Sequence, residues 1–443
     1  MIIKKLKLEE ILITLFPFLI ITGPAIPDIS AVIIICIFIY KIFKNKNFKI
    51  NKNYWIYIFI LLNLWFIFIS FFSFNFKLSI IDSIIFARFI IFIIAVTYFI
   101  QSNENLLKYI LYSIFLAIIF VTIDTLFQFY NYSSEEGFKS DFFGIKEKGL
   151  YGRLNGPFND YIPGSYLSRF YFFILLIFFI NKKFIKNKYI LSFFSILLSI
   201  ILSTIFFTGE PMAACTTLLG ILIILIFLKN YRKIILTIIV LSSIIILVNK
   251  LFHPFYNDYK ILNNSSLHEG LVIEKSFKCN DNPLKTCSKI FHKQPSILTT
   301  LRNFKDSPYG EIYITALQMW KNNKITGIGL NNFQEVCKKI KKYEKFNKNF
   351  GCGTHPHNFY IQILAESGLP GFIIFTCLIF SWIYKFKNFN KNHYKIIGLI
   401  ILITIFWPIM STGSFLKNGN MIFISFLLGI ILGIKSSLIT INE

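Results

Sequence analysis

Residues 189–207 read YILSFFSILLSIILSTIFF, a run without one charged side chain. A helix that crosses a bilayer needs roughly 20 mostly apolar residues, because its backbone groups must bond internally and its side chains face lipid. Similar segments recur along the chain, so the sequence predicts an all-α polytopic membrane protein of about twelve spans. The spans are expected at residues 8–24, 28–43, 54–73, 79–100, 107–129, 163–180, 189–207, 212–228, 233–249, 369–385, 395–411 and 419–434.

The composition excludes a soluble globular protein. Of 443 residues, 55% are hydrophobic and only 15% are charged. The net charge of +24 would favour nucleic acid, but most lysines lie in short clusters between apolar runs, where they set membrane orientation. We therefore expect the lipid bilayer as a partner and no nucleic acid.

The basic clusters predict the orientation of the spans. Lys and Arg are retained on the cytoplasmic side of a membrane, and four Lys-rich linkers fall on one side of the twelve-span order. These linkers are residues 41–53, 181–188, 228–233 and 385–395. Both termini are thus expected in the cytoplasm.

The first residues, MIIKKLKLEEILITLFPFLIITG (1–23), have the basic start and apolar run of a signal peptide. A second apolar run follows at once, and no convincing small-residue cleavage site separates the two, so we expect a retained first span. The turn at residues 23–28 between these two short spans is equally compatible with a re-entrant hairpin.

This orientation places two long polar segments outside, at residues 131–162 and 250–368. It divides the chain into residues 1–249 with nine spans, the large external loop 250–368, and residues 369–443 with three spans. A loop as long as 250–368 is usually functional.

The large external loop is basic. From residue 250 to residue 354 it carries 17 Lys and Arg against 8 Asp and Glu. Long loops escape the rule that keeps basic residues inside. The segment is either a solvated basic loop or an electropositive lid that gathers an anionic substrate.

Four of the seven cysteines lie in this loop: Cys279, Cys287, Cys337 and Cys352. An even number outside the cytoplasm suggests two disulfides, and pairing of sequence neighbours, Cys279 with Cys287 and Cys337 with Cys352, is the simplest of three connectivities. Four free thiols or a metal site are the alternatives, although the chain has no CxxC spacing of the kind that zinc sites use.

An amphipathic helix is predicted at residues 311–322, because apolar side chains recur there at helical spacing. We expect this helix to lie along the bilayer surface. The Gly-Ile-Gly at residues 327–329 is more typical of a helix stop than of a phosphate-binding loop. The apolar positions of the helix are Ile312, Ala316, Met319 and Trp320.

The densest polar motif occupies residues 354–371, THPHNFYIQILAESGLPG. Pro356 suits the first turn of a helix, so His357 and Asn358 are expected near a helix N-terminus, where partial positive charge favours anions. Glu366 is half a turn out of phase with His357 on an ideal helix, so the two are not expected to pair. Two histidines one residue apart also fit metal ligands, but no third histidine or carboxylate stands at ligand spacing.

At this motif the sequence resembles a known family. GIGLNNF at residues 327–333, followed by HPHN and LAESG within 355–368, is similar to the O-antigen ligase and polymerase superfamily, over about residues 310–375. The resemblance implies a GT-C-like glycosyltransferase of the bacterial inner membrane with its active site facing the periplasm. It also implies a glycan donor on undecaprenyl diphosphate, an acceptor such as the lipid A-core or another glycan or protein, and no metal or cofactor.

A second matching patch is GRLNGPFNDYIPGSYLSRF at residues 152–170. Its Arg153 is expected at the membrane surface, where a planar guanidinium suits a diphosphate. Arg169 falls within the next span, where an arginine is costly enough to indicate a function. Snorkelling to the interface is the alternative, and Arg88 in the fourth span is open to the same two interpretations.

Two positions depart from the family pattern. Between the seventh and eighth spans members commonly carry an arginine, whereas this chain has Pro211 after Glu210, and Tyr309 stands at another usual arginine position. Arg302 and Lys305 are close enough in sequence to Tyr309 to compensate. The departures are compatible with altered acceptor use or with lost activity.

The resulting hypothesis is a single displacement at the anomeric carbon of the donor. A base orients or deprotonates the acceptor hydroxyl, and cationic side chains neutralise the diphosphate leaving group. The base is expected to be His357, supported by His355 and Asn358. The cations are expected to be Arg153 and Arg302, with Arg169 in reserve and Lys305 as a further substrate-binding residue.

Two alternatives stay open. A polymerase that joins carrier-linked repeat units shares the motif with a ligase, so the sequence does not separate them. A transporter or flippase also has about twelve spans, but such folds usually show internal repeats and paired interrupted helices. We find neither in this sequence.

Overall fold

The computed structural model describes most of the chain, and all structural statements below concern the described residues. These are 6–44, 53–103, 105–147, 150–160, 162–180, 186–258, 272–279, 282–293, 302–344, 351–387, 392–409 and 413–434.

The chain forms two compact units. The first unit comprises Met1–Ile110, Thr300–Lys391 and Ile405–Glu443, and the second comprises Leu111–Thr299 and Asn392–Thr404. These boundaries cut across the divisions after residues 249 and 368, because helices far apart in the sequence pack together within each unit.

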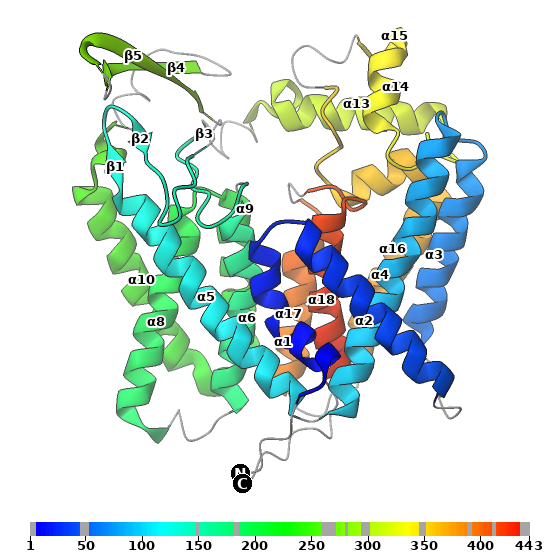
Figure 1. Cartoon of the computed structure of the whole chain (residues 1–443), viewed down its shortest axis with the longest axis horizontal. Coiled ribbons are helices and arrows are strands. Elements are labelled where there is room, and N and C mark those ends of the chain that lie inside the picture. The colour runs from blue at the N-terminus through cyan, green and yellow to red at the C-terminus, as the bar shows by residue number, and fades with distance from the viewer. Residues whose placement is uncertain are drawn as a thin grey trace. The chain divides into compact units, whose positions relative to one another are not determined.

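Each of the twelve segments expected to span the membrane coincides with a helix in the described part of the chain. Six of these helices are long and apolar enough to cross a bilayer: α2 (Ala25–Lys44), α4 (Phe76–Ser102), α5 (Leu106–Tyr130), α8 (Lys188–Phe207), α10 (Arg232–Phe252) with the preceding turn η1 (Lys229–Tyr231), and α16 (Phe359–Lys387). The others are shorter: α1 (Leu8–Ile21), α3 (Tyr54–Ser70), α6 (Pro163–Ile180), α9 (Pro211–Phe227), α17 (Asn392–Phe406) and α18 (Asn418–Gly433). The fold is that of an almost entirely helical polytopic membrane protein (Figure 1).

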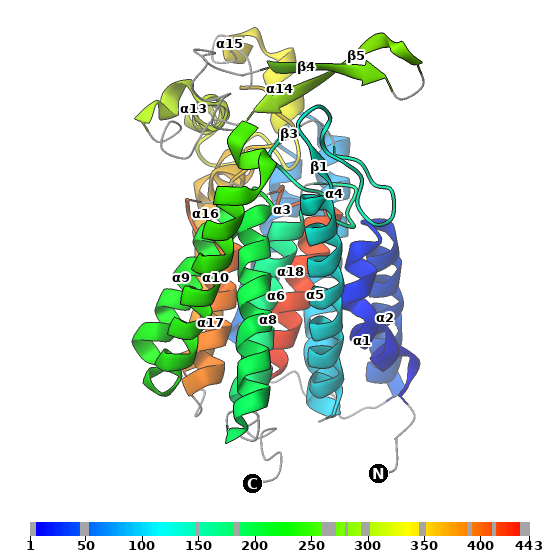
Figure 2. The same ribbon diagram turned by 90° about the vertical axis from the view of Figure 1, so that its left-hand side faces the viewer.

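Lipid-facing surfaces are recognisable by exposed apolar side chains. One stripe of α10 carries apolar residues that are each more than half exposed: Leu236, Val240, Ile244 and Leu247. Another stripe faces α8, where the hydroxyls of Ser199 and Ser203 donate to the carbonyls of Ile238 and Ser242 at 3.2 and 3.3 Å. Figure 2 shows α8 and α10 side by side. Polar groups inside and apolar groups outside are what a bilayer requires.

In the first unit, α18 packs along α4, and α3 packs against both α4 and α16. Glycine permits the close approach of α18, because a Cβ at Gly429 would lie 2.7 Å from Val96. The intramembrane Arg88 of α4 forms an ion pair with Asp28 of α2, with Nη1 3.0 Å from Oδ1. Arg88 therefore has a counter-charge within the helix bundle.

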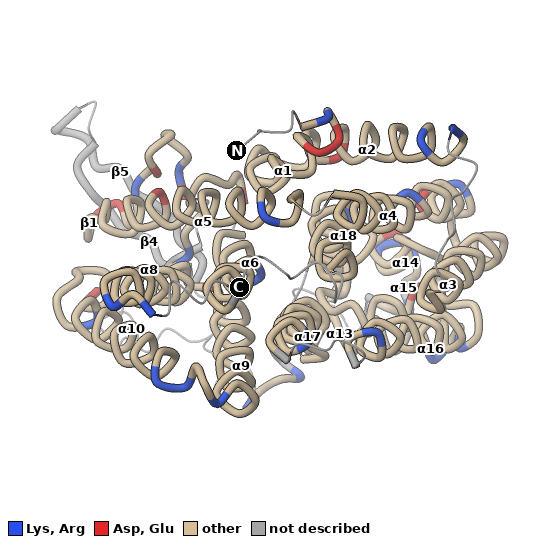
Figure 3. The backbone as a smooth tube through the Cα atoms, turned by 90° about the horizontal axis from the view of Figure 1, so that it is seen from below, with Lys and Arg blue, Asp and Glu red and all other residues tan. Residues whose placement is uncertain are grey.

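Charged residues are sparse among the helices, as Figure 3 shows from below. Glu9 near the start of α1 forms an ion pair with Lys41 near the end of α2. The two helices are thus an antiparallel hairpin, turned at Gly23, whose φ is +98°. This geometry is the same whether the hairpin crosses the bilayer or re-enters it.

The part of the second unit that lies beyond its long helices contains strands that the sequence did not predict. β1 (Tyr132–Ser133) pairs with β2 (Gly137–Phe138), and β4 (Val272–Cys279) forms an antiparallel hairpin with β5 (Asn282–Lys293), to which β3 (Leu150–Tyr151) adds in parallel. In the register Cys287 stands opposite Phe277, and Cys279 opposite Asn282. The side chains of Cys279 and Cys287 lie outside the described residues, so their disulfide stays a prediction.

The part of the first unit formed by residues 308–344 is helical where the structure describes it. Figure 1 shows α13 (Pro308–Asn322), α14 (Phe333–Lys339) and α15 (Lys341–Glu344) at one end of α3, α4 and α16. The expected amphipathic helix exists as α13, but its apolar face does not lie on the bilayer. It packs into a protein core. The expectation was wrong because hydrophobic periodicity predicts an apolar face but does not identify what covers that face. The buried core comprises Ile312, Ala316, Met319, Ile328, Phe333, Val336, Cys337, Tyr343 and Ala365.

Candidate active site

The helix that carries the densest motif, α16, begins later than the sequence suggested. It starts at Phe359, so Pro356 does not occupy its first turn. Asn358 is its N-cap instead: the side-chain Oδ1 accepts the backbone N–H groups of Tyr360 and Ile361 at 3.0 and 3.1 Å. Asn358 Nδ2 donates to the carbonyl of Pro408 at 2.7 Å. Its first role is therefore to fix the start of α16.

His357 lies directly before this cap and has a left-handed backbone conformation, with φ of +54°. Its ring centroid is 4.0 Å from that of His355, which is only 7% exposed. Nδ1 of His355 is 2.9 Å from the hydroxyl of Thr354. A left-handed conformation is strained for a residue other than glycine, by about 1–3 kcal/mol. The surrounding contacts hold His357, which is partly exposed, in this conformation.

Two tyrosines from the first turns of α13 reach the same loop. The ring of Tyr309 lies edge-on to His357, with centroids 5.9 Å apart. One turn later, the side chain of Tyr313 is hydrogen-bonded to Asn358. Burial raises the pKa of Tyr313 to about 12 against this hydrogen bond, so its phenol stays protonated. The residue at the family's usual arginine position is thus a direct neighbour of His357.

The helix α13 is well defined at this end. Ser307 is the N-cap, and its hydroxyl accepts the N–H of Gly310 at 3.1 Å, while Pro308 occupies the first turn. Arg302 and Lys305 precede this start and are exposed. They belong to the same unit as the two histidines.

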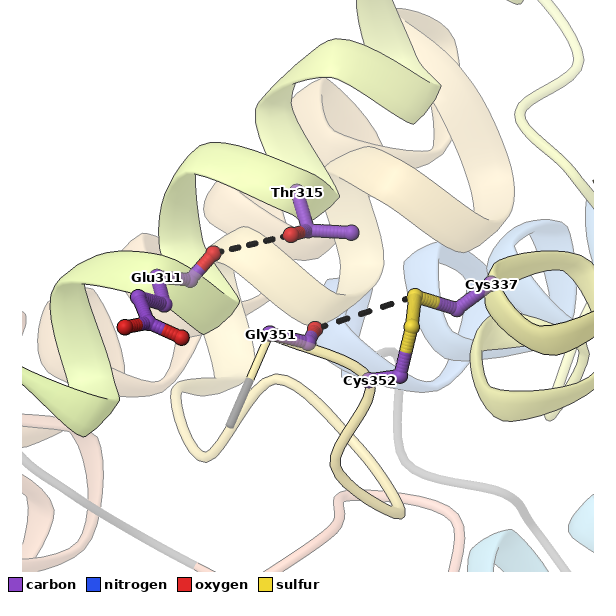
Figure 4. The surroundings of a disulfide bond; sticks show 5 residues. All are labelled: Glu311, Thr315, Cys337, Gly351 and Cys352. Atoms are coloured by element: carbon purple, nitrogen blue, oxygen red, sulfur yellow. Dashed lines mark hydrogen bonds between the residues drawn. A yellow bond between two sulfur atoms is a disulfide. The ribbon is translucent and has the colours of Figure 1, made fainter. Parts of the chain in front are cut away.

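A disulfide joins Cys337 of α14 to Cys352, with Cα atoms 5.5 Å apart. This is the pairing that the sequence predicted. Figure 4 shows the bond beside α13, where the hydroxyl of Thr315 donates to the carbonyl of Glu311 at 2.9 Å. The bond ties the segment that leads to His355 to α14, on the same core as α13.

The Gly-Ile-Gly segment does more than follow a helix. Its backbone pairs with α16, where Ile328 N–H donates to the carbonyl of Ala365 and Gly329 N–H to that of Glu366, both at 3.0 Å. α16 bends here, because Gly368 has φ of +69°. A Cβ at Gly368 would overlap the carbonyl oxygen of Ile325. Backbone hydrogen bonds thus join the two halves of the family motif, which are residues 327–333 and 355–368.

Glu366 is the buried acidic side chain at this joint and is 1% exposed. Its carboxyl group accepts hydrogen bonds from the side-chain amide of Gln362 at 3.2 Å and from the backbone N–H groups of Asn331 and Phe333. Asn331 in turn donates to Asp82 of α4 at 2.9 Å. The sequence predicts that Glu366 does not pair with His357 but gives no indication of this role. A single acid in the apolar helix 359–371 was the available signal.

The same loop also docks on the turn between α3 and α4. Leu330 N–H donates to the hydroxyl of Ser79 at 3.0 Å, and Asn332 Oδ1 accepts the N–H of Asn75 at 3.1 Å. Asn75 Nδ2 also donates to Glu335 at 3.1 Å. Three segments far apart in the sequence therefore meet at residues 327–335, and sequence spacing alone gives no signal for this.

A second cluster of candidate residues lies in the second unit. Arg169 of α6 is buried, with 7% of its surface exposed, and the charge of Glu210 acts on it. The charge of Arg153 also acts on Glu210. Burial raises the pKa of Glu210, and the Ser165 hydroxyl and Arg153 oppose this rise. Arg169 is not a snorkelling side chain but part of a buried charge group.

The structure thus gathers the candidates into two groups. His355, His357 and Asn358 assemble with Tyr309 and Tyr313 in the first unit. Arg153 and Arg169 assemble around Glu210 in the second unit. Within the described residues, no three or more His, Cys, Asp or Glu side chains come together in a way that would hold a metal ion.

Comparison with known proteins supports the family assignment. Residues 194–376 match a family model described as O-antigen ligase. A comparison with curated proteins finds no match. The match runs from α8 into α16 and includes Glu210, Tyr309 and the His357 loop, whereas Arg153 and Arg169 precede it. The match confirms the resemblance to the O-antigen ligase superfamily over these residues, which include the His357 loop.

Proposed function

We propose that the protein is a glycosyltransferase of the ligase type, which moves a glycan from undecaprenyl diphosphate to an acceptor hydroxyl such as one on the lipid A-core. The observation that carries this proposal is the backbone conformation of His357 together with the side chains that surround its ring. It is a partly exposed imidazole beside His355 and Tyr309, held in a left-handed conformation at the start of α16. A strained residue in a family motif is where catalysis is expected.

On the acceptor side, His357 acts as the general base. Its neutral imidazole accepts the proton of the acceptor hydroxyl while that oxygen attacks the anomeric carbon of the donor sugar. His355 and Thr354 support the ring, and Asn358 fixes the turn from which it projects. Each of these groups acts through the position of His357.

On the donor side, the bond between the anomeric carbon and the diphosphate oxygen breaks, and undecaprenyl diphosphate leaves with the bonding electrons. Arg153 and Arg169 neutralise the negative charge that develops, and Arg302 and Lys305 add exposed positive charge. No metal or organic cofactor takes part in this scheme.

We place the enzyme in the bacterial inner membrane with residues 131–162 and 250–368 in the periplasm. The Lys-rich linkers support this orientation. The disulfide between Cys337 and Cys352 supports it as well, because disulfides persist in oxidising compartments.

The direct test is transfer by purified protein in liposomes that contain a glycan linked to undecaprenyl diphosphate and a lipid A-core acceptor. We expect a glycosylated core in the presence of a chelator, and loss of most product with His357→Ala. His393→Ala in α17 is the matched control and should keep full activity. Wild-type protein that forms no product with either a core or a glycan acceptor would remove the proposal.

The glycolipid profile of a strain that lacks the gene separates ligase from polymerase. Free lipid core with accumulated carrier-linked polymer indicates a ligase. A core that bears single repeat units indicates a polymerase. Carrier-linked glycan that stays on the cytoplasmic side of the membrane would instead indicate a flippase.

A further inference from the structure

The turn between α8 and α9, residues 208–210, holds the N-terminus of α6. Oε1 of Glu210 accepts the N–H of Gly164 at 2.7 Å, and Oε2 accepts the N–H of Ser165 at 3.2 Å and its hydroxyl at 2.6 Å. These N–H groups belong to the first turn of α6 and have no partner within that helix. A carboxylate with 8% of its surface exposed thus supplies the cap of another helix.

The same turn touches the segment that carries Arg153. The carbonyl of Thr208 accepts the N–H of Leu154 at 3.1 Å. Gly209 has φ of +72°, and a Cβ there would overlap the carbonyl oxygen of Gly152 and lie 3.3 Å from Cα of Arg153. The backbone on both sides of Arg153 therefore rests on residues 208–209.

The turn at residues 208–210 therefore contacts both of the segments that carry the two arginines. Arg153 is bracketed by its contacts to Thr208 and Gly209, and Arg169 lies on α6, whose first turn Glu210 caps. The charge of Arg153 also acts on the Glu210 carboxylate, and the charge of Glu210 acts on Arg169.

We propose that Glu210 is a positioning residue that fixes Arg153 and Arg169 for binding of the donor diphosphate. This inference rests on the proposed function, because it takes the diphosphate as the ligand of the two arginines. It assigns a role to the turn in which the family's usual arginine is replaced by proline.

The substitution Glu210→Gln separates positioning from simple charge. Three donors converge on the two carboxylate oxygens, and a glutamine side chain has only one acceptor oxygen, so at least one donor is left without a partner. Arginine side chains whose supporting backbone is less well fixed are expected to bind a diphosphate less tightly. If Glu210 were only a competing negative charge, its removal would tighten the binding instead.

The experiment measures the affinity of the detergent-solubilised protein for undecaprenyl diphosphate, with donor KM and kcat from the liposome assay. For Glu210→Gln we expect an affinity about tenfold weaker and a KM raised by a similar factor, with kcat changed less. Ser165→Ala removes a single donor and should give a smaller change in the same direction, which covers the case in which Glu210→Gln does not fold. The matched control is Glu135→Gln, an exposed residue of the same unit.

The outcomes distinguish the inference from the proposed function. Unchanged or tighter binding by folded Glu210→Gln, or a loss of thermal stability with unchanged KM, overturns the positioning role alone. Unchanged affinity of Ser165→Ala overturns it as well if Glu210→Gln is unfolded. Wild-type protein that does not bind undecaprenyl diphosphate overturns the proposed donor and this inference with it.

Discussion

His357 illustrates how a single residue can be costly to stability and useful to function. Its left-handed backbone is unfavourable, yet a glycine at this position would remove the imidazole that the proposed chemistry needs. His355 and Tyr309 contact the ring, and Asn358 caps the helix that follows. The conformation is therefore surrounded by side chains from its own loop and by Tyr309, which is distant in the sequence.

Loss of the proposed base should leave donor binding intact. We expect His357→Ala to lower turnover by roughly 10²–10⁴-fold with little change in affinity for undecaprenyl diphosphate. Transfer kinetics and donor binding on the same preparation check this. Near-normal transfer by His357→Ala, combined with loss of activity in a chelator, would show that the two histidines are metal ligands instead.

Loss of a charge-pairing arginine should give a different defect. Arg153→Ala exposes phosphate charge that is no longer compensated, so both donor affinity and turnover should fall, by about tenfold or more in affinity. Arg153→Lys should restore only part of the affinity, because a point charge cannot form the bidentate pair. Full restoration by lysine would contradict bidentate binding, and an unchanged affinity of the alanine variant would exclude Arg153 from the donor site.

At the scale of elements, the central feature of the first unit is the joint between residues 327–335, α16 and the turn after α3. Backbone hydrogen bonds and the buried Glu366 hold the three together. Glycine is required at the bend of α16, because Gly368 combines a positive φ with contact to the Ile325 carbonyl.

The joint can be tested by comparing two glycines. Gly368→Ala should destabilise the protein by about 2 kcal/mol or more, because it adds a steric overlap to an unfavourable φ. Gly23→Ala is the control, since Gly23 also has a positive φ, of +98°, but has open space around its Cβ. Thermal unfolding in detergent should show the larger loss for Gly368→Ala. Equal losses would mean that the contact at the bend contributes nothing.

The disulfide between Cys337 and Cys352 links α14 covalently to the segment that leads to His355. It closes a loop with a sequence separation of 15, which corresponds to about 3 kcal/mol. Cys337→Ser should therefore lower the unfolding temperature, whereas Cys377→Ser, at a free cysteine of α16, should not. Peptide mapping without reduction should recover Cys337 linked to Cys352. Recovery of both as free thiols would remove this element from the site.

The amino-acid sequence predicts the helices of this protein better than it predicts which elements pack against one another. Spans such as 79–100 are apparent because lipid imposes a long apolar run on each helix. The same periodicity is ambiguous for α13, whose apolar face covers protein and not lipid. The helix α16 starts later than Pro356 predicts. Proline is common in a first turn, but here the side chain of Asn358 caps the helix two residues further on. The partners of Glu210 and Glu366 lie in other elements, and no local pattern predicts them.

For the whole molecule, the decisive question is on which side of the membrane each segment lies. The α1–α2 hairpin does not affect the answer. α1 has 14 residues and is about 21 Å long, less than the roughly 30 Å core of a bilayer. Whether it spans or re-enters, its start and the end of α2 emerge on one side, as the ion pair of Glu9 with Lys41 indicates.

The orientation is therefore set by the later helices, and reporter fusions test it. Fusions near residues 185 and 390, in Lys-rich linkers, should report cytoplasmic, because basic clusters resist translocation. Fusions at Glu135 and near Asn264 should report periplasmic, the first because it follows α5 on the external side and the second because long loops cross regardless of charge. A periplasmic signal at residue 185 would invert the second unit and place Arg153 on the cytoplasmic side. In that case the diphosphate-binding role of Arg153 would have to be abandoned along with the topology, since a periplasmic donor would be out of its reach.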